Sequence, residues 1–471
     1  MSIIKELEGF LGAGQVLTGE AAAPFLVDWR NRYQGSALAV VRPGSTEEVA
    51  GVVRLCVQHN VPLVPQGGNT SLCGAATPDE SGKSIVMSLQ RMNKVRSIDT
   101  DNDTMTVEAG CVLQSLQEAA REAGRLFPLS LAAEGSCTIG GNLSTNAGGT
   151  QVLRYGNTRD LTLGLEVVTA EGEIWHGLRG LRKDNTGYDL RDLYIGSEGT
   201  LGIITAATMK LYPLPVAQRT AMLALNSLED AIEVLSRARA GFGASLTGFE
   251  VMGGSVLQAV VRLFPQQRLP FEGESANSAW FALLELSDSE SADHAQQRFE
   301  EVLGKAIEDG LVMDAAIAEN IAQSKAMWHL RESIPLAEAE IGKSVKHDVS
   351  IPISLIAKFV ETTNAALQVK FPGVHHVVFG HLGDGNLHYN VVRADNMTEQ
   401  GLMDKQYEVY ELVHDSVHAF GGSISAEHGV GQLKRDQLPR YKTELELKLM
   451  KRIKDALDPK GLMNPGKVLQ A

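Results

Sequence analysis

Short apolar runs alternate with polar turns along the first part of the chain. The runs have lengths that are usual for strands. They are residues 37–42, 61–64, 161–170, 173–176 and 202–211. Between the first two runs, Ser45 and Glu48 form the capping-box pattern that begins a helix, which we expect to extend to about His59. Two prolines follow the last run, so the pattern predicts a first domain over residues 1–215.

After these prolines the pattern restarts, with longer helical periods between the strands. We expect a strand from about Ala221, a strand over 279–286, and helices over 228–238, 292–309, 315–331, 399–419 and 445–457. The polar, irregular segment 265–278 is expected to be an exposed loop. This arrangement predicts an α+β domain over residues 216–420. Residues 421–471 are expected to form a small helical C-terminal segment that returns to the functional site.

Composition and charge indicate a globular protein without a nucleic-acid partner. The chain has 471 residues, of which 44% are hydrophobic and 21% are charged, and this length suits two or three domains. Its net charge of −14 provides no basic stripe to neutralise phosphates. An anionic substrate would therefore need local cations that overcome the surrounding negative field.

The N-terminus and the cysteines favour a cytoplasmic protein without a membrane span. Residues 1–14 predict an amphipathic helix and lack the basic start and unbroken apolar run of a signal peptide. No apolar stretch approaches the roughly 18 residues of a transmembrane helix. The four cysteines have no CxxC spacing, which argues against a disulfide framework or a zinc ribbon. They are Cys56, Cys73, Cys111 and Cys137.

Three glycine-rich clusters lie in the first domain, at residues 67–71, 138–149 and 196–202. Such loops expose backbone N–H groups and let the main chain approach a phosphate closely. One cluster alone would indicate an ordinary tight turn, but three together predict a large phosphorylated cofactor that lies across several loops. No GxGxxG sequence opens a helix, so a Rossmann NAD site is unsupported. The Gly-Lys-Ser sequences at 82–84 and 342–344 lack the upstream glycine of a P-loop.

Six motifs follow one another in this domain. They are Pro65–Ser71, Cys137–Asn142, Asn146–Gly149, Tyr155–Asp160, Gly187–Leu190 and Gly196–Gly202. In this order they resemble the FAD-binding domain of the vanillyl-alcohol-oxidase/p-cresol-methylhydroxylase superfamily, over about residues 37–215. The resemblance implies a two-subdomain FAD-binding fold, with an α+β substrate (cap) domain beside it. Relatives that bind flavin covalently often carry a histidine where this chain has Asn69, which implies non-covalent FAD.

The resemblance also implies which residues contact FAD. The first loop would hold the pyrophosphate, and the second loop and Ile203 would approach the cofactor. The residues assigned in this way are Pro65, Gln66, Gly67, Gly68, Asn69, Thr70, Ser71, Thr138, Gly140, Gly141, Asn142, Ser144, Gly148, Gly149, Glu198, Gly202, Ile203 and Asn464.

A histidine-rich segment, residues 374–392, predicts a β-hairpin. Two β-rich runs flank Asp384-Gly385, a pair favoured in two-residue hairpin turns. With that turn, His381 lies directly opposite His388, with Cβ atoms about 5 Å apart. The spacing therefore places two imidazoles where they can share one metal ion.

A third ligand is available further along the chain. Glu427 and His428 stand side by side in a glycine-flanked loop, and two histidines with one glutamate suit Zn²⁺ or a similar divalent ion. The predicted hairpin register also places Asn390 on the face of the two histidines. A competing pair, His414 and His418, has helical spacing, but its apolar neighbours favour packing over metal binding.

The C-terminal half carries a second set of ordered motifs. They are Trp328–Ser333, Lys346–Ser350, Gly380–Asn390, Glu427–Gly431 and Asp458–Lys467. They resemble the C-terminal domain of FAD-linked D-lactate and D-2-hydroxyglutarate dehydrogenases, so resemblance covers nearly the whole chain. With it we assign the metal to His381, His388 and Glu427. The residues assigned to substrate are Arg331, Lys346, Asn390 and His428.

These assignments predict the oxidation of a small D-2-hydroxy acid to the 2-keto acid. The metal would lower the pKa of the hydroxyl group, flavin N5 would accept the hydride, and His428 would take the proton, with His347 as the next candidate. Arg331 and Lys346 together favour a dicarboxylate such as D-2-hydroxyglutarate. Pro335 departs from that branch of the family, which often carries threonine there.

Other functions stay open at this level. A D-lactate or glycolate dehydrogenase of the same family is the first alternative. A flavin electron-transfer module without its own substrate and a metal-dependent hydrolase are others, although a hydrolase would leave the glycine clusters unexplained. By resemblance, the electron acceptor is an electron-transfer flavoprotein or a quinone, and relatives are often homodimers.

Overall fold

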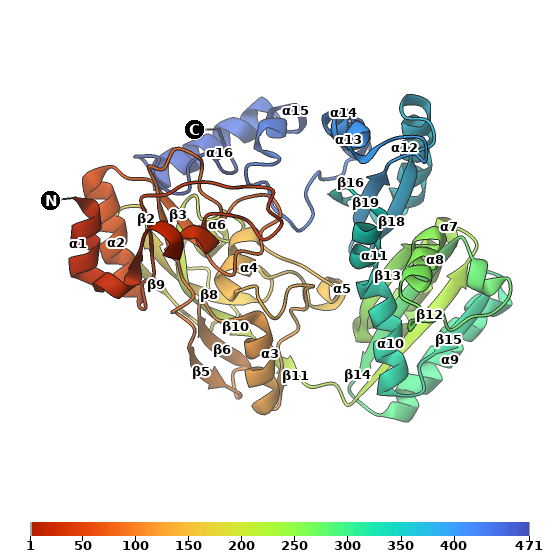
Figure 1. Ribbon diagram of the computed structural model, residues 1–471. Helices are drawn as coiled ribbons and strands as arrows, with labels where there is room; N and C mark the ends of the chain where they lie inside the picture. Colours follow the sequence, from red (N-terminus) through yellow and green to blue (C-terminus); the bar gives the residue numbers. More distant parts are fainter. Residues whose placement is uncertain (1, 471) are drawn as a thin grey trace. The chain divides into compact units, whose positions relative to one another are not determined.

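The computed structural model describes residues 2–470, and the chain divides into two compact units. The first unit comprises Met1–Gly148, Gly156–Leu214 and Glu427–Ala471. The second comprises Gly149–Tyr155 and Pro215–Ala426. Both contain helices and sheets, which confirms the predicted α+β class (Figure 1). In the described part of the chain, no helix is long and apolar enough to cross a membrane.

The first unit contains a four-stranded sheet of order β1-β2-β4-β3, a five-stranded antiparallel sheet of order β5-β6-β10-β8-β9, and the pair β7–β11. Its strands are β1 (Val16–Leu17), β2 (Ala39–Val41), β3 (Leu63–Gln66), β4 (Ile85–Ser88), β5 (Val95–Asp99), β6 (Thr104–Glu108), β7 (Arg125–Leu126), β8 (Thr162–Thr169), β9 (Ile174–Gly177), β10 (Gly202–Lys210) and β11 (Tyr212–Pro213). Its helices are α1 (Ile3–Leu11), α2 (Thr46–His59), α3 (Leu113–Glu122), α4 (Ile139–Thr145), α6 (Arg191–Tyr194), α15 (Leu438–Tyr441) and α16 (Glu444–Leu457).

Helix α2 forms where the capping pattern predicted it. The Ser45 hydroxyl accepts the N–H of Glu48 at 3.2 Å, which satisfies one of the free donors at the helix start. The helix buries Val49 and Val53 in a core shared with both sheets. The predicted strands near residues 39, 63, 162, 174 and 202 are also confirmed. All four cysteines are free and buried, as expected for a chain without a disulfide framework.

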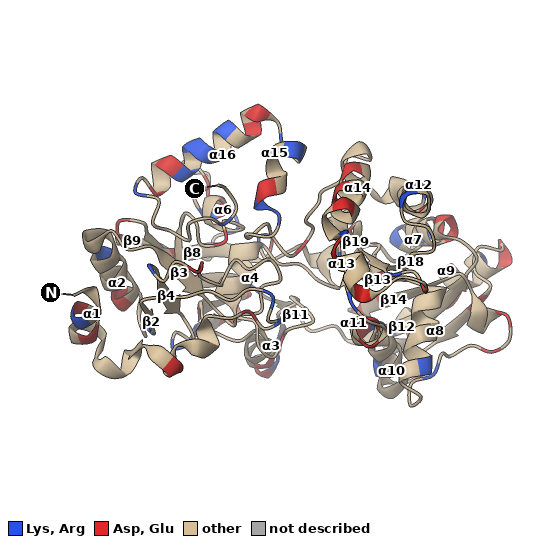
Figure 2. Ribbon diagram, turned by 45° about the horizontal axis from the view of Figure 1, so that its top comes forward, with Lys and Arg blue, Asp and Glu red and all other residues tan. Residues whose placement is uncertain are grey.

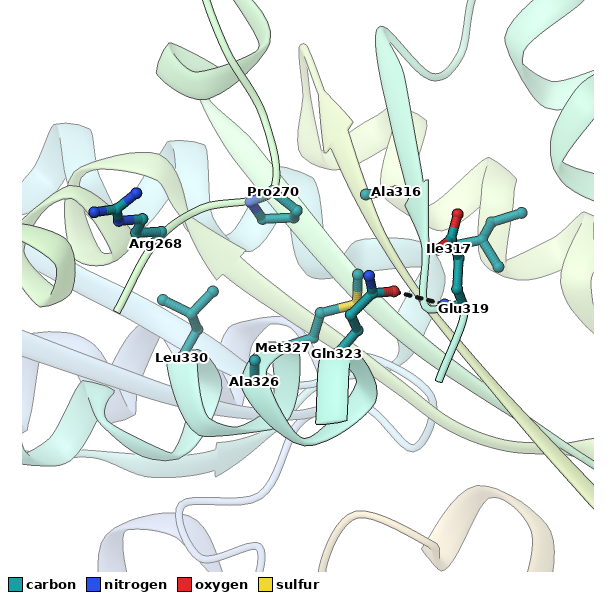
Figure 3. Close-up of a pocket in the computed structure, with 9 residues that line it drawn as sticks. All are labelled: Arg268, Pro270, Ala316, Ile317, Glu319, Gln323, Ala326, Met327 and Leu330. Atoms are coloured by element: carbon teal, nitrogen blue, oxygen red, sulfur yellow. Dashed lines mark hydrogen bonds between the residues drawn. The ribbon is translucent and has the colours of Figure 1, made fainter. Parts of the chain in front are cut away.

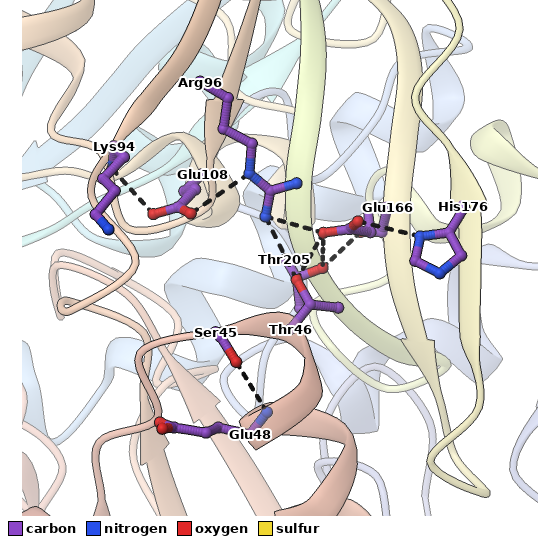
Figure 4. Close-up of polar contacts among 9 residues, drawn as sticks. All are labelled: Ser45, Thr46, Glu48, Lys94, Arg96, Glu108, Glu166, His176 and Thr205. Carbon is purple, nitrogen blue, oxygen red and sulfur yellow. Dashed lines mark hydrogen bonds and ion pairs between the residues drawn. The ribbon is translucent and has the colours of Figure 1, made fainter.

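A buried polar network ties α2 to the five-stranded sheet (Figure 4). The carboxylate of Glu166 accepts hydrogen bonds from Thr46 at 2.6 Å, from Arg96 at 3.1 Å and from Thr205 at 3.1 Å. Burial raises the pKa of Glu166, but these hydrogen bonds and the charge of Arg96 outweigh burial and hold the pKa below its usual value. The network therefore contributes stability while Glu166 is ionised.

The C-terminal segment completes the first unit. The N–H of Leu63 donates to the carbonyl of Leu462 at 2.9 Å, and the N–H of Asn464 donates to the carbonyl of Leu63 at 2.8 Å, so the segment pairs with the edge strand β3. Acidic and basic residues both lie along α16 (Figure 2), with ion pairs such as Lys448–Glu444 at 2.6 Å. Such pairs suit a solvated helix face.

The second unit is built on one antiparallel eight-stranded sheet of order β15-β12-β14-β13-β18-β19-β16, with β17 also paired to β19. Its strands are β12 (Ala217–Leu225), β13 (Leu246–Gly253), β14 (Trp280–Asp288), β15 (Asp314–Ile317), β16 (Ser344–Val345), β17 (Asp348–Ser350), β18 (His375–His381) and β19 (Asn386–Val392). Its helices are α5 (Val152–Tyr155), α7 (Leu228–Phe242), α8 (Gly254–Leu263), α9 (Ala292–Glu308), α10 (Ile321–Glu332), α11 (Ile334–Ile341), α12 (Ile356–Lys370), α13 (Glu399–Met403) and α14 (Gln406–Ala419).

Helices cover both faces of this sheet. Helices α8, α10 and α11 share a core with alternate strand residues such as Met252 and Phe281, whereas α7 and α9 contact β12 and β14 on the other face (Figure 1). Three residues that concern function share this face, because Glu250 has the same strand parity as Met252 and these two residues pair in register with His381 and Phe379. They therefore point toward the face that α8, α10 and α11 cover.

Three predictions for this unit were wrong in part. The helix expected over 315–331 begins only at Ile321, because residues 314–317 pair with β12 as strand β15 and Asn320 then caps the helix. The helix expected over 399–419 is interrupted at Lys405, whose backbone (φ −101°, ψ 4°) leaves helical geometry. The loop 265–278 is irregular but not wholly exposed, since Phe271 packs into the core.

Candidate functional site

Two glycine loops of the first unit meet closely enough to exclude any side chain. A Cβ atom on Gly67 would lie 2.3 Å from the hydroxyl oxygen of Thr138, and one on Gly68 would lie 1.9 Å from the carbonyl oxygen of Ser136. Only glycine fits such an approach. The loop after β3 and the loop before α4 are thus brought together, as a cofactor lying across several loops requires.

Polar atoms around these loops are buried without a partner among the described residues. They are Asn69 Oδ1, Thr138 Oγ1, Asn142 Oδ1 and Asn464 Oδ1. A buried acceptor left unpaired costs about 1–3 kcal/mol, so these atoms suit a polar ligand that supplies donors. Four residues assigned to FAD from the sequence therefore have the chemistry that a bound FAD requires.

Other residues assigned to FAD have side chains engaged within the protein. Gln66 donates from Nε2 to two backbone carbonyls, at 3.0 and 2.9 Å, and Ser144 donates to a carbonyl of its own helix at 2.7 Å. The carboxylate of Glu198 accepts the N–H groups of Val430 and Gly431, at 2.7 and 2.8 Å. These side chains shape the loops rather than offer free polar groups to a cofactor.

Two lysines near Glu198 were missed by sequence reasoning. Lys434 is buried, and its ammonium has no hydrogen-bond partner among the described residues. Lys467 is also buried, and burial lowers its pKa to about 8. Burial raises the pKa of Glu198, and both lysines act against that rise. Lys467 closes a motif that the resemblance includes, whereas Lys434 stands outside all of them, so the sequence carried no signal for it.

The histidine hairpin forms, but its register differs from the prediction by two residues. Phe379, and not His381, pairs with His388, and the loop is the four-residue segment 382–385. The carbonyl of His381 accepts two backbone N–H groups of that loop, at 3.2 and 3.1 Å, which closes a longer turn than Asp-Gly alone. Because a shift of two residues keeps each side chain on its face, the His381 and His388 rings remain 5.9 Å apart between centres.

His388 lies at the centre of the side chains that could hold a metal ion. Within the second unit, the potential ligands are His381 and Asp348, which both lie beside His388. Two histidines and a carboxylate suit zinc or a similar divalent ion. Asp348 pairs directly with His388 across β17 and β19 and was not among the predicted ligands. Its place in the Lys346–Ser350 motif was the signal for it.

A buried carboxylate joins one of these histidines to the predicted substrate arginine. Glu250 on β13 accepts a hydrogen bond from His381 Nδ1 at 2.6 Å and another from Arg331 Nε at 2.9 Å. Burial raises the pKa of Glu250, but the charges and hydrogen bonds of His381 and Arg331 outweigh burial and hold it below its usual value. The guanidinium of Arg331 also lies over the ring of Phe379, 4.8 Å from its centre.

Lys346, the second predicted substrate cation, rests on another buried carboxylate. Its ammonium donates to Glu338 Oε2 at 2.8 Å, and Asn390 Nδ2 donates to the same oxygen at 3.1 Å. The Lys346 side chain is 35% exposed, whereas that of Glu338 is 2% exposed. The ammonium is therefore reachable from solvent, while the carboxylate that balances it is not.

His347 lies on the opposite face of the sheet from Lys346 and Asp348. Its Nδ1 is 2.8 Å from the carbonyl oxygen of Tyr389, and its ring contacts those of Tyr389, Tyr410 and His414. This position does not support His347 as the alternative base, because the potential metal ligands lie on the other face. His414 is buried in the same cluster, as expected for a packing residue.

A pocket of about 260 Å³ lies beside α10 and β15 (Figure 3). Its lining includes Met327 and Leu330, with Arg268 and Glu319 as its charged residues. None of the residues assigned to substrate or metal lines it. Because the pocket gathers no group of ligands or catalytic side chains, the group around His388 is the better candidate site.

Comparisons with known proteins show the family of this chain. A model described as "FAD binding domain" matches residues 37–177, and one described as "FAD linked oxidases, C-terminal domain" matches residues 214–468. The chain is 40% identical to mitochondrial D-2-hydroxyglutarate dehydrogenase of Bos taurus, covering 97% of this chain and 81% of that protein. It is 39% identical to D-2-hydroxyglutarate dehydrogenase of Xanthomonas citri pv. viticola, covering 94% and 91%.

A solved structure shares the fold. p-Cresol methylhydroxylase with substrate bound has a TM-score of 0.76 to this chain at 18% identity, covering 99% of this chain and 96% of that one. This likeness confirms the predicted fold, with its FAD-binding domain and a second α+β domain.

Proposed function

Because this chain belongs to the FAD-linked oxidase family, we propose that it oxidises D-2-hydroxyglutarate to 2-oxoglutarate with the help of a divalent metal. It is an FAD-dependent oxidoreductase related to the D-2-hydroxyglutarate dehydrogenases. One observation carries the choice of substrate: the sheet face with His381 and His388 also carries Lys346 and is contacted by Arg331. A metal site with two cations beside it suits a hydroxy acid that has a second carboxylate.

Arg331 and Lys346 would hold the distal carboxylate of this substrate. Since Arg331 uses Nε for Glu250, its two terminal nitrogens remain for a carboxylate, and Lys346 adds a point charge. Burying that carboxylate unpaired would cost several kcal/mol. D-Lactate has no such group, so the two cations favour the dicarboxylate. Pro335 offers no hydroxyl. Asn390, which donates to the same Glu338 oxygen as Lys346, would help to orient the substrate.

The reaction requires loss of the hydroxyl proton and of a hydride. When bound, FAD would accept the hydride at N5, and a divalent ion held by His381, His388 and Glu427 would lower the pKa of the hydroxyl group. His428 takes the hydroxyl proton, since a neutral imidazole is a suitable base near pH 7. The resemblance to this family favours an electron-transfer flavoprotein or a quinone as the external electron acceptor.

An anaerobic bleaching panel tests this function. The yellow protein is mixed with D-2-hydroxyglutarate, D-malate, D-lactate or glycolate, and flavin absorbance is followed before and after chelation and zinc addition. We expect D-2-hydroxyglutarate to bleach the flavin fastest, chelation to abolish bleaching and zinc to restore it. A flavin that no hydroxy acid bleaches would indicate an electron-transfer module instead. Full activity in rigorously metal-free protein would refute the role of the metal.

Two histidine variants of the hairpin separate the metal site from the fold. His388→Ala is expected to abolish turnover while FAD stays bound, because His388 lies in the second unit and the glycine loops lie in the first. His375→Ala is the matched control, since His375 is exposed at the start of β18 and pairs with an exposed aspartate. Loss of FAD from the His388 variant, or equal loss of activity in both, would contradict the assignment.

A further inference from the structure

Glu250 is a carboxylate in the interior of the second unit, out of contact with solvent. It lies on β13 in the middle of the sheet, paired in register with Leu283 of β14 on one side and with His381 of β18 on the other. Its side chain is fully buried. An ionised carboxylate in such a place is costly unless its oxygens are satisfied by donors.

Each oxygen of this carboxylate serves a different partner. Oε1 is 2.6 Å from His381 Nδ1, and Oε2 is 2.9 Å from Arg331 Nε. Among the described residues, these are its hydrogen-bond partners. One rigid group therefore holds two side chains that come from different elements, the end of strand β18 and helix α10.

For His381, this contact determines which ring nitrogen faces a metal. A proton on Nδ1 is donated to Glu250, so Nε2 keeps its lone pair for an ion. Carboxylate–histidine contacts of this kind commonly change metal affinity by about 10- to 100-fold when they are removed.

For Arg331, the contact determines which edge of the guanidinium remains available. Nε is used by Glu250, and the ring of Phe379 supports one face of the guanidinium at 4.8 Å. The terminal nitrogens are left for a carboxylate, and their plane is fixed from two sides. Phe379 in turn pairs directly with His388, so the side chain that supports Arg331 is also a neighbour of the other ligand histidine.

We propose that Glu250 is a positioning residue that sets the metal ligand His381 and the substrate cation Arg331 together. It would touch neither the metal nor the substrate and would act on both through one carboxylate. This inference rests on the proposed function, because it takes His381 as a ligand and Arg331 as a substrate contact. Glu338, another buried acid of the second unit, instead accepts hydrogen bonds from Ser344, Lys346 and Asn390.

Glu250→Gln tests the inference, with Glu285→Gln as the matched control. Glu285 is a buried acid on the adjacent strand β14, and it accepts hydrogen bonds from Thr247 and Trp328, each at 3.2 Å. Burial raises the pKa of Glu285, and Glu285 contacts neither His381 nor Arg331 in these hydrogen bonds. Both variants replace a buried carboxyl by an amide of the same shape, but only the first removes a charge between His381 and Arg331.

Two measurements are made on the FAD-loaded proteins. Zinc affinity is measured by competition with a chelator, and kcat and KM for D-2-hydroxyglutarate are measured at saturating zinc. We expect Glu250→Gln to weaken zinc binding by about 10- to 100-fold. We also expect excess zinc to restore most of kcat while KM stays raised, because zinc repairs the occupancy of the metal site but not the position of Arg331. Glu285→Gln should leave both quantities near the wild-type values, and FAD content should be equal in all three proteins.

Wild-type zinc affinity in Glu250→Gln would overturn the inference, and so would a wild-type KM beside weakened zinc binding. Equal losses in the Glu285 variant would show a general effect on the sheet and would also overturn it. A wild-type protein that binds no zinc and turns over without metal would instead refute the proposed metal site. In that case, the KM of Glu250→Gln would still test whether Glu250 positions Arg331 for the substrate. If Glu250→Gln does not fold, Glu250→Asp is used, because it keeps the charge but is too short to reach both partners. Zinc affinity and KM of this variant then test the inference in the same way.

Discussion

Replacement of Lys346 by methionine is the sharpest test of substrate choice. The Lys346 ammonium lies 2.8 Å from Glu338, whose side chain is almost fully buried. Methionine keeps the apolar stem of the side chain but removes its charge. Among the described residues, Glu338 then keeps the donors of Ser344 and Asn390, at 2.5 and 3.1 Å. The distal carboxylate of the substrate would lose a cation and face an unbalanced negative charge.

The size of this effect follows from the loss of the cation that balances the buried Glu338 carboxylate. Such truncations cost about 2–4 kcal/mol, which corresponds to about 30- to 900-fold in kcat/KM. We expect this loss for D-2-hydroxyglutarate and hardly any loss for D-lactate, which has no distal carboxylate. Steady-state kinetics with both substrates measures the difference.

Two further variants complete this test. Lys358→Met removes an exposed lysine of an i,i+3 surface pair and is expected to change neither rate, because such pairs contribute little. The double variant Lys346→Met with Glu338→Gln removes both charges and is expected to recover part of the loss, since no unbalanced carboxylate remains. An equal loss on both substrates in Lys346→Met would mean that Lys346 serves the shared carboxylate or the fold, and the reasoning would be refuted.

Three other predictions concern the flavin, the base and stability. Acid precipitation should release all the flavin, because Asn69 replaces the histidine of covalent relatives; flavin in the pellet would contradict this. His428→Ala should lower kcat by about 100-fold or more with a smaller effect on KM, as steady-state kinetics would show, and an unchanged kcat would move the role of base elsewhere. Glu166→Gln should lower the free energy of unfolding by about 3 kcal/mol at pH 7. Because the folded-state pKa of Glu166 is lowered, the wild-type advantage is present above the unfolded value of about 4.3 and is lost as the pH falls through the folded value. Urea unfolding at pH 7 and below pH 4 measures the difference in unfolding free energy between the wild type and the variant. A difference that does not narrow at low pH would contradict this prediction.

Elements specified by near neighbours could be predicted from the sequence. Helix α2 spans Thr46–His59 as expected, because its cap and its apolar period are local properties of that segment. The predicted strands 161–170 and 173–176 also form, and they pair as a hairpin around Glu171-Gly172. The errors occurred where distant residues decided. Residues 315–317 were expected to be helical, but pairing with β12 makes them part of strand β15.

The sequence by itself determined which chemical groups meet at the hairpin. His381 and His388 come together because they flank one short turn, and this survived a register error of two residues since strand faces repeat every two residues. Only the tertiary structure decided which charges are balanced. Glu250 lies 131 residues from His381 and 81 from Arg331, and it meets them through the order of strands in the sheet and the packing of α10. Burial makes an unpaired charge costly, so Glu250 and Glu166 are found where partners from other elements reach them, and no local pattern contains that information.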